Sequence, residues 1–334
     1  MKALLCREYG PVDGLRVEEV PSPRAGPEQV VVEVKASSLN FPDALLVQGL
    51  YQVKPPLPFS PGMELAGVVK EVGSGVAGLK KGDRVLGSPG RGGFAQECLV
   101  SADHVWPLPS QMDFETGSAL IITYCTSLHA LQDRGHLQPG ETLVVLGAAG
   151  GVGTSAIEVG KAMGAKVIAA ASSEEKLAFC RTLGADETIN YDEPNLRQGI
   201  LELTGGRGAD VIYDPVGGGY TEAALRATAW GGRLLVIGFT SGTIPQVKLN
   251  LALLKERSLI GVYWGDWARQ YPEEQRRTVE QLGAWLAEGK IKPAVSERIS
   301  LAEVPAAMMR LLQRKVKGKI VVVQSDGNEV RKVT

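Results

Sequence analysis

The residues best suited to chemistry form a glycine-rich run, Gly147-Ala148-Ala149-Gly150-Gly151-Val152-Gly153. The run follows an apolar segment and precedes a stretch with helical spacing. Such a turn binds the pyrophosphate of a dinucleotide, because the first N–H groups of a helix are unpaired and its dipole is positive there. Gly150 is expected to let the backbone approach the pyrophosphate, and Gly153 to let the helix pack on the strand. Ala148 stands where the fingerprint has its first glycine.

The residues after the next predicted strand indicate which dinucleotide is bound. A site for NAD usually has Asp or Glu about 20 residues beyond the turn, on the ribose 2′-OH. Here the chain has Ser172-Ser173, followed by Lys176. Hydroxyls and an ammonium favour a 2′-phosphate, which a carboxylate would repel. Glu174-Glu175 fit a helix N-terminus, where negative charge is stabilised. Tyr191, after the third predicted strand, could donate another hydrogen bond. The sequence therefore favours NADPH over NADH, and the alternative for Lys176 is a solvated helix residue.

Alternating strands and helices must position this turn. Continuous apolar runs are typical of strands buried on both faces, and their alternation with helices predicts a parallel sheet of right-handed βαβ units. The predicted strands are Leu143–Leu146, Val167–Ala171, Glu187–Ile189, Asp210–Tyr213, Arg233–Ile237 and Ser258–Tyr263. The predicted helices between them are Val152–Met163, Glu174–Leu183, Asn195–Leu203 and Glu222–Ala229.

The first 120 residues show short strands separated by turns rich in Pro and Gly, which predicts a compact β barrel or sandwich. Its strands include Gln29–Lys35, Leu65–Val72 and Phe94–Val100. After Gly265 the chain has two amphipathic segments, Pro272–Glu288 and Leu301–Arg314, and a strand, Lys319–Val323. One strand and two helices make a poor core alone, so this portion is expected to pack back on the first domain. The tail Ser325–Thr334 is expected to fray.

Composition excludes several classes of protein. The chain has 334 residues, which suggests two domains, and a net charge of -1, which disfavours binding of nucleic acid. No apolar run reaches the roughly 18 residues of a membrane helix, and Met1–Cys6 reads as a strand rather than a signal peptide. The four cysteines are scattered, as expected for buried thiols in the cytoplasm. The three histidines, likewise scattered, are interpreted as packing or surface residues.

Motifs along most of the chain resemble the medium-chain dehydrogenase/reductase superfamily, and within it the zinc-free NADPH:quinone oxidoreductase branch. They are Ser38–Asp43, Gly49–Tyr51, Pro61–Gly67, Gly82–Val85, Ala148–Gly153, Ile189–Tyr191, Asp214–Gly218 and Gly231–Arg233. The resemblance implies an α/β fold in which a Rossmann dinucleotide-binding domain, residues 122–264, is inserted in a GroES-like β-barrel catalytic domain, residues 1–121 and 265–334. It also implies a homodimer formed through the edge strand Leu259–Tyr263.

The residues argue against zinc. By resemblance, zinc-dependent relatives use Cys and His ligands at two positions where this chain has Asn40 and Met63. Neither side chain matches the thiolate, imidazole and carboxylate ligands that Zn²⁺ prefers. A quinone or a conjugated enone is already electrophilic, so hydride transfer to it needs hydrogen-bond donors rather than a metal. Asp43, Glu64 and Asp83 look structural by the same resemblance.

The resemblance also implies the remaining site residues. Asn40 and Tyr51 line the nicotinamide end, where Tyr51 is expected to donate to a cofactor or substrate oxygen; the alternative is a packing tyrosine. Thr123 or Thr126 is expected to contact the nicotinamide amide or a phosphate. The nicotinamide or its ribose is expected to contact Gly238, Phe239, Tyr263 and Trp264. Trp264 could instead be a core or interface residue. No general acid is assured, and water could protonate a reduced quinone.

The predicted function is NADPH-dependent hydride transfer to a small-molecule quinone without zinc. The first alternative is a reductase of α,β-unsaturated carbonyls or enoyl thioesters. The second, from another class, is a catalytically silent NADPH-binding protein.

Overall fold

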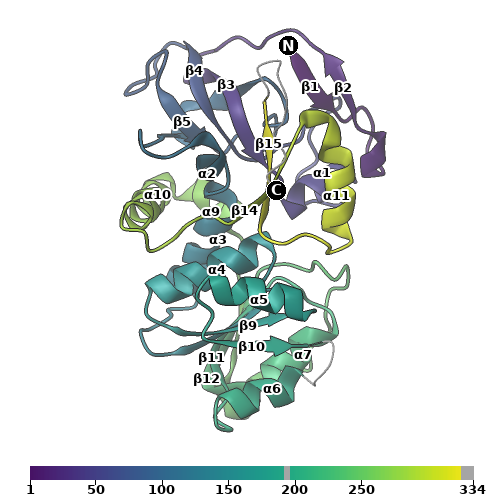
Figure 1. Cartoon of the computed structure of the whole chain (residues 1–334), viewed down its shortest axis with the longest axis vertical. Coiled ribbons are helices and arrows are strands. Elements are labelled where there is room, and N and C mark those ends of the chain that lie inside the picture. The colour runs from purple at the N-terminus through teal and green to yellow at the C-terminus, as the bar shows by residue number, and fades with distance from the viewer. Residues whose placement is uncertain (192–195, 325–334) are drawn as a thin grey trace. The chain divides into compact units, whose positions relative to one another are not determined.

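The computed structural model describes residues 1–191 and 196–324, so the expectation about the tail Ser325–Thr334 lies outside the described residues. The chain divides into two compact units (Figure 1). The first unit is Met1–Ile122 together with the chain from Pro293 onward, and the second unit is Thr123–Lys292. Both ends of the chain therefore build the first unit, as expected. The sequence placed the second boundary at residue 265, which is wrong, because the structure places it at Pro293.

Contacts of two helices explain this correction. Helices α9 (Trp264–Gln270) and α10 (Pro272–Ala287) belong to the second unit. The ring of Trp267 stacks on that of His129 with centroids 4.2 Å apart. The backbone N–H of Lys292 donates to Glu158 Oε2 at 3.0 Å. An amphipathic pattern predicts that a helix buries one face, but it does not say which domain covers that face.

The first unit is built on an antiparallel sheet extended by one parallel pair. Within the described residues the spatial order is β14-β15-β3-β4-β5-β7, and β6 also pairs with β3. Strand β3 is long enough for two partners on one side, since Gln29–Glu33 pair with β6 and Ala36–Ser38 pair with β15. The strands are β3 (Gln29–Ser38), β4 (Leu65–Val72), β5 (Arg84–Gly87), β6 (Glu97–Ser101), β7 (Val105–Pro107), β14 (Val295–Ile299) and β15 (Lys319–Val323). A separate antiparallel pair consists of β1 (Lys2–Leu5) and β2 (Arg16–Glu19).

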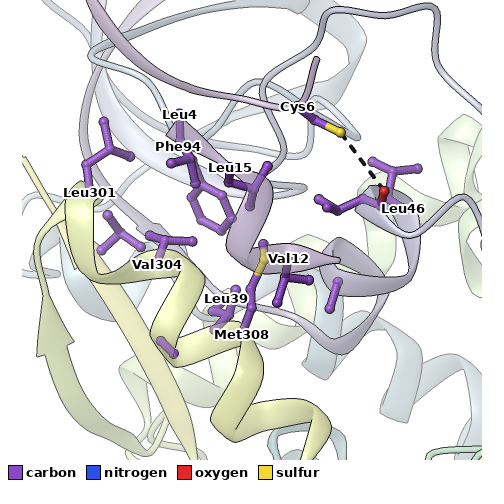
Figure 2. Packing of buried hydrophobic residues seen from close by; sticks show 14 of the residues in the cluster. Leu4, Cys6, Val12, Leu15, Leu39, Leu46, Phe94, Leu301, Val304 and Met308 are labelled. Atoms are coloured by element: carbon purple, nitrogen blue, oxygen red, sulfur yellow. Dashed lines mark hydrogen bonds between the residues drawn. The ribbon is translucent and has the colours of Figure 1, made fainter. Parts of the chain in front are cut away.

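A hydrophobic core joins the two ends of the chain within this unit. Its helices are α1 (Phe41–Val47), α2 (Phe114–Ser118) and α11 (Val304–Leu312). Val304 and Met308 of α11 pack in one cluster with Leu39 and Leu15 from the N-terminal half, as Figure 2 shows. The expected return of the C-terminal portion to the first domain is confirmed for Leu301–Leu312 and β15 but is wrong for Pro272–Glu288, which belongs to the second unit. The helix predicted over Leu301–Arg314 starts later, because Leu301–Glu303 forms a 3₁₀ turn ahead of it.

The second unit contains the predicted parallel sheet. Within the described residues its order is β10-β9-β8-β11-β12-β13, and every neighbouring pair is parallel. All five residues of β8 are buried, which fits a strand covered on both faces. The strands are β8 (Thr142–Leu146), β9 (Lys166–Ala171), β10 (Glu187–Asn190), β11 (Ala209–Asp214), β12 (Thr228–Val236) and β13 (Ser258–Gly261).

The helices of this unit flank its sheet. Apart from α9 and α10, they are α3 (Thr126–Leu128), α4 (Gly151–Ala162), α5 (Glu174–Thr182), α6 (Leu196–Leu203), α7 (Gly219–Arg226) and α8 (Asn250–Leu253). One π-helical segment, His129–Arg134, also belongs to this unit, and another, Ile121–Cys125, spans the boundary between the two units. The chain runs outward from β8 to β10 and returns to β11 on the other side of β8. Right-handed crossovers therefore place α4 and α5 on one face and α6 and α7 on the other. The change of direction between β8 and β11 is where ligands bind in such sheets.

One predicted element of this sheet is shifted. The sequence placed a helix over Glu222–Ala229, whereas α7 is Gly219–Arg226 and β12 already begins at Thr228. The earlier start follows from the loop before it: Gly218 has a φ of +62°, and the Thr221 hydroxyl donates to Asp214 Oδ2 at 2.6 Å.

Candidate active site

The glycine-rich turn has the shape that the sequence predicts. Gly147 has a φ of +58°, and its carbonyl accepts from the Gly150 N–H at 2.9 Å. A Cβ on Gly153 would lie 2.4 Å from the Gly147 oxygen, so glycine at this position lets the first turn of α4 approach the backbone of the glycine-rich turn. A Cβ on Gly150 would meet only that same oxygen, at 3.4 Å. Gly150 therefore leaves open the approach to the first N–H groups of α4, which by geometry have no acceptor within the helix.

The loop after β11 closes one side of this turn. Asp214 Oδ1 accepts from the backbone N–H groups of Val216 and Gly217, both at 2.9 Å. A Cβ on Gly147 would lie 2.9 Å from Val216 Cγ2, so the two loops are in close contact. The carboxylate of Asp214 thus shapes the loop at the change of direction in the sheet.

Three of the residues predicted to hold the 2′-phosphate lie near one another beyond β9 and β10. The Ser173 hydroxyl accepts from the Lys176 N–H at 3.4 Å and caps α5, which begins at Glu174 as expected. Lys176 Nζ donates to Ser172 Oγ at 3.1 Å. The Tyr191 N–H donates to the Ala171 carbonyl at 3.2 Å, which ties Tyr191 to the residue preceding Ser172. The ammonium of Lys176 and the hydroxyl of Ser172 therefore lie together, and the backbone of Tyr191 is bonded to the end of the same strand.

A buried network connects the start of the second unit to the glycine-rich helix. Thr123 is buried in the π-helical segment, and its carbonyl accepts from Ser155 Oγ at 3.0 Å. Ser155 Oγ also donates to the Val152 carbonyl at 3.1 Å and lies 2.8 Å from Ser127 Oγ. The structure thus brings Thr123 and Val152 together. Thr126 begins α3 and is half-buried.

The last cofactor candidates lie beyond the carboxyl ends of β12 and β13. The Gly238 N–H donates to the Asp214 carbonyl at 3.4 Å, and Phe239 is partly exposed beside Gly217. Tyr263 is exposed, whereas Trp264 is buried and its Nε1 donates to Gln275 Oε1 at 2.8 Å. The indole N–H of Trp264 is therefore already paired within the protein.

Asn40 lies in the first unit, at the N-terminus of α1, in a buried cluster with Ser38, Glu64 and Lys319; we call these four residues the Asn40 cluster. Asn40 Nδ2 donates to the Ser38 carbonyl at 3.2 Å and to Glu64 Oε1 at 2.9 Å. Its Oδ1 accepts from Lys319 Nζ at 2.6 Å. An ammonium can only donate, which fixes the orientation of the amide. Both amide hydrogens of Asn40 are used within the protein, so the arrangement favours a positioning role over donation to a substrate.

Asp43 lies next to this cluster and is fully buried. Its two oxygens accept from the N–H groups of Asn40 at 2.9 Å and Gly62 at 3.0 Å. Burial raises the pKa of Asp43 to about 7, although these hydrogen bonds and the charge of Lys319 act in the opposite direction. Tyr51, the other catalytic candidate, is half-buried and packs against the hydrophobic cluster of the first unit.

Sequence reasoning missed several residues of these sites. Tyr220 packs against Tyr191 with ring centroids 4.7 Å apart. Gln275 is buried and joins Trp264 to Cys125, whose Sγ accepts from Gln275 Nε2 at 3.5 Å. Lys319 was assigned only to a strand. Each is remote in sequence from its partner, and a single polar residue in an amphipathic pattern gives no signal of what it contacts.

The described residues contain neither a group of metal ligands nor a membrane-spanning helix. No three His, Cys, Asp or Glu side chains in residues 1–191 and 196–324 are grouped so that they could hold a metal ion. The four cysteines are free and buried. Over the same residues, no helix has the length and hydrophobicity needed to cross a membrane.

Comparisons with known proteins give one consistent result. Two family models match: "Alcohol dehydrogenase GroES-like domain" over residues 26–110 and "Zinc-binding dehydrogenase" over residues 151–285. A quinone oxidoreductase-like protein 2 homolog of Nematostella vectensis is 41% identical over 96% of this chain and 88% of its own length. The Escherichia coli quinone oxidoreductase complexed with NADPH has a TM-score of 0.91 and 29% identity, over 97% of this chain and 100% of that one. The CurK enoyl reductase has a TM-score of 0.87 and 28% identity, over 96% and 98%.

The description of the second family model implies zinc, and the residues present do not fit it. Asn40 and Met63 supply an amide and a thioether, which are poor ligands for Zn²⁺. Lys319 Nζ lies 2.9 Å from Glu64 Oε1 and 2.6 Å from Asn40 Oδ1. A fixed ammonium therefore already occupies the oxygen atoms that a cation would need, and its charge would repel one.

Proposed function

This chain belongs to the quinone oxidoreductase group of the medium-chain dehydrogenase/reductase superfamily, and on that basis we propose that it is an NADPH-dependent oxidoreductase that reduces a quinone without zinc. The observation that carries the proposal is the set of hydrogen-bond donors beyond the carboxyl ends of the parallel strands. There the glycine-rich turn beyond β8 and the Ser172–Lys176 pair beyond β9 offer the two groups of donors that NADPH requires.

The roles of the cofactor residues follow from this placement. The N–H groups of Gly151, Val152 and Gly153 receive the pyrophosphate, and Gly150 leaves room for it. Ser172, Lys176 and Tyr191 hold the 2′-phosphate. The nicotinamide half contacts Thr123, Thr126, Gly238, Phe239, Tyr263 and Trp264, with Trp264 offering its ring face because its N–H is paired. NADPH, when bound, supplies the hydride.

The residues of the first unit act on the acceptor. Tyr51 donates a hydrogen bond to an oxygen of the quinone and stabilises the charge that develops there. Asn40 keeps the N-terminus of α1 in place through the Asn40 cluster. Asn40 and Met63 are poor ligands for a zinc ion that would act as a Lewis acid, and an acceptor that is electrophilic by itself does not need one. A quinone meets this requirement, and its reduced oxygens take protons from water.

The similarity to the CurK enoyl reductase supports a second candidate, reduction of conjugated enones or enoyl thioesters. Steady-state oxidation of NADPH with benzoquinone, a naphthoquinone, an enone and an enoyl thioester separates the two. Turnover of the quinones supports the proposal, whereas turnover of the thioester alone refutes it. Tight binding of NADPH without turnover of any acceptor would instead identify a silent NADPH-binding protein.

We also propose a homodimer, and the cytoplasm as its location. Strand β13 is an edge strand, and Leu259 on it and Leu249 and Leu253 nearby are exposed. Free edges and exposed apolar side chains of this kind are suited to pairing with a second copy. Light scattering after size exclusion should give twice the chain mass, and Leu259→Lys should give a monomer. The four free, buried thiols suit a reducing compartment, and cell fractionation tests the location.

A further inference from the structure

The ion pair of Glu64 and Lys319 needs an explanation other than stability. Their side chains are 1% and 2% exposed, and Oε1 and Nζ are 2.9 Å apart. Burying two charges costs hydration energy that the attraction between them often does not exceed, so a buried pair is weak evidence of stabilisation. Apolar residues of similar volume would fill this space at lower cost. The pair therefore points to a role in fixing geometry.

The hydrogen bonds of the pair are saturated. Lys319 Nζ donates to the Leu39 carbonyl at 3.3 Å as well as to Asn40 Oδ1 and Glu64 Oε1, which accounts for its three protons. Glu64 Oε1 also accepts from Ser38 Oγ at 2.5 Å and from Asn40 Nδ2 at 2.9 Å. The carboxylate can therefore neither rotate nor shift without breaking several hydrogen bonds.

The second carboxylate oxygen of Glu64 binds the backbone at the end of the first unit. Glu64 Oε2 accepts from the backbone N–H of Ile122 at 2.9 Å. Ile122 is the last residue of the first unit before the chain enters the second unit at Thr123. This N–H belongs to the π-helical segment Ile121–Cys125, an irregular geometry that is frequent at functional sites.

We propose that Lys319 is a positioning residue, whose ammonium orients the side chain of Glu64 toward the Ile122 amide and so fixes the segment that carries Thr123 and Thr126. The proposal rests on the proposed function, in which these two threonines contact the cofactor. Lys319 is the charged donor in this set, because Ser38 and Asn40 offer Glu64 only neutral donors.

The test replaces both charges, since Lys319→Met alone leaves an unpaired buried carboxylate and can unfold the protein. The double variant Lys319→Met with Glu64→Gln removes both charges of the pair together, and the glutamine has one acceptor oxygen where the carboxylate had two. The matched control is Lys70→Met with Glu97→Gln, a Lys–Glu pair of the first unit 2.7 Å apart whose lysine is exposed. Two quantities are measured in each protein: hydrogen exchange of the Ile122 amide, and the Kd for NADPH by direct titration.

The expected result is a folded double variant in which the Ile122 amide exchanges roughly 10-fold faster and the Kd for NADPH rises roughly 10-fold, the change that the loss of one hydrogen bond produces. The control should match the wild type in both. The proposal is overturned if the double variant fails to fold, if its Ile122 amide stays protected, or if its Kd is unchanged. The exchange measurement needs neither cofactor nor acceptor, so failure of the proposed function, seen as a wild type that reduces no acceptor, is distinguished from failure of this inference.

Discussion

Replacing Lys176 by alanine tests the assignment of the 2′-phosphate site. Lys176 Nζ lies 3.1 Å from Ser172 Oγ, so the ammonium is already held beside the hydroxyl that would share the phosphate. A hydrogen bond to a charged group contributes about 1.5–3 kcal/mol, and Lys176 is only half-buried, so solvent places its contribution near the lower end. A loss of about 1.5–2 kcal/mol corresponds to a roughly 10- to 30-fold rise in the Kd for NADPH. NADH lacks the phosphate, and its Kd should change by less than about twofold.

Fluorescence titration of both dinucleotides at one ionic strength measures the effect. Lys166→Ala is the matched control, because Lys166 is an exposed lysine at the opposite end of β9 and its loss changes the net charge equally. Ser172→Asp extends the test: a carboxylate there repels the phosphate and pairs with Lys176, so the preference should shift toward NADH. An equal loss of affinity for NADPH and NADH in Lys176→Ala would refute the assignment and leave Lys176 as a solvated helix residue.

Three further outcomes follow from the structure. Gly150→Ala should keep the melting temperature but weaken NADPH binding in titrations, whereas Gly153→Ala should lower the melting temperature, since its Cβ would lie 2.4 Å from a carbonyl oxygen; equal melting temperatures would contradict the packing argument. Dialysis against zinc followed by metal analysis should leave no stoichiometric zinc, because Lys319 occupies the oxygens of Glu64 and Asn40; one bound zinc per chain would show that the fit was misjudged. Asp43 binds its proton more tightly in the folded state, with a pKa of about 7, so its contribution to the free energy of unfolding should fall as pH rises from about 4 to about 7, by up to about 4 kcal/mol. Urea unfolding across this range should show that the free energy of unfolding of the wild type falls relative to that of Asp43→Asn as pH rises, and parallel curves would exclude Asp43 as the titrating group.

The second unit was predictable because its signals are local. The buried run of β8, the glycines beyond it and the Ser173 cap of α5 each lie within a few residues of what they determine. The same holds for the Ser172–Lys176 pair, which is one helical turn apart. Family resemblance added the residues beyond β12 and β13, whose positions at the sheet edge depend on the whole topology.

The remaining features depend on contacts that sequence spacing does not encode. Strand β14 has the sequence Val-Ser-Glu-Arg-Ile, with three polar residues in a row, so its sequence indicates a loop. Its strand structure depends on pairing with β15. Helix α1 has only seven residues and a proline in its first turn. Seven residues are too few for the helical period of apolar residues to be recognised. The side on which α10 packs is set by the contacts of Trp264 and Gln275, and these residues are 11 positions apart.

The bond between Glu64 and Lys319 spans 255 positions of the chain, so its two partners emerge from the ribosome at very different times. Until the C-terminal segment has been synthesised, the carboxylate of Glu64 has no Lys319 ammonium to pair with, and β3 lacks its neighbour β15. The parallel sheet of residues 123–292 can be complete before Lys319 is translated. Domains generally fold as units during synthesis, so the middle of this chain should reach its native form before its beginning does.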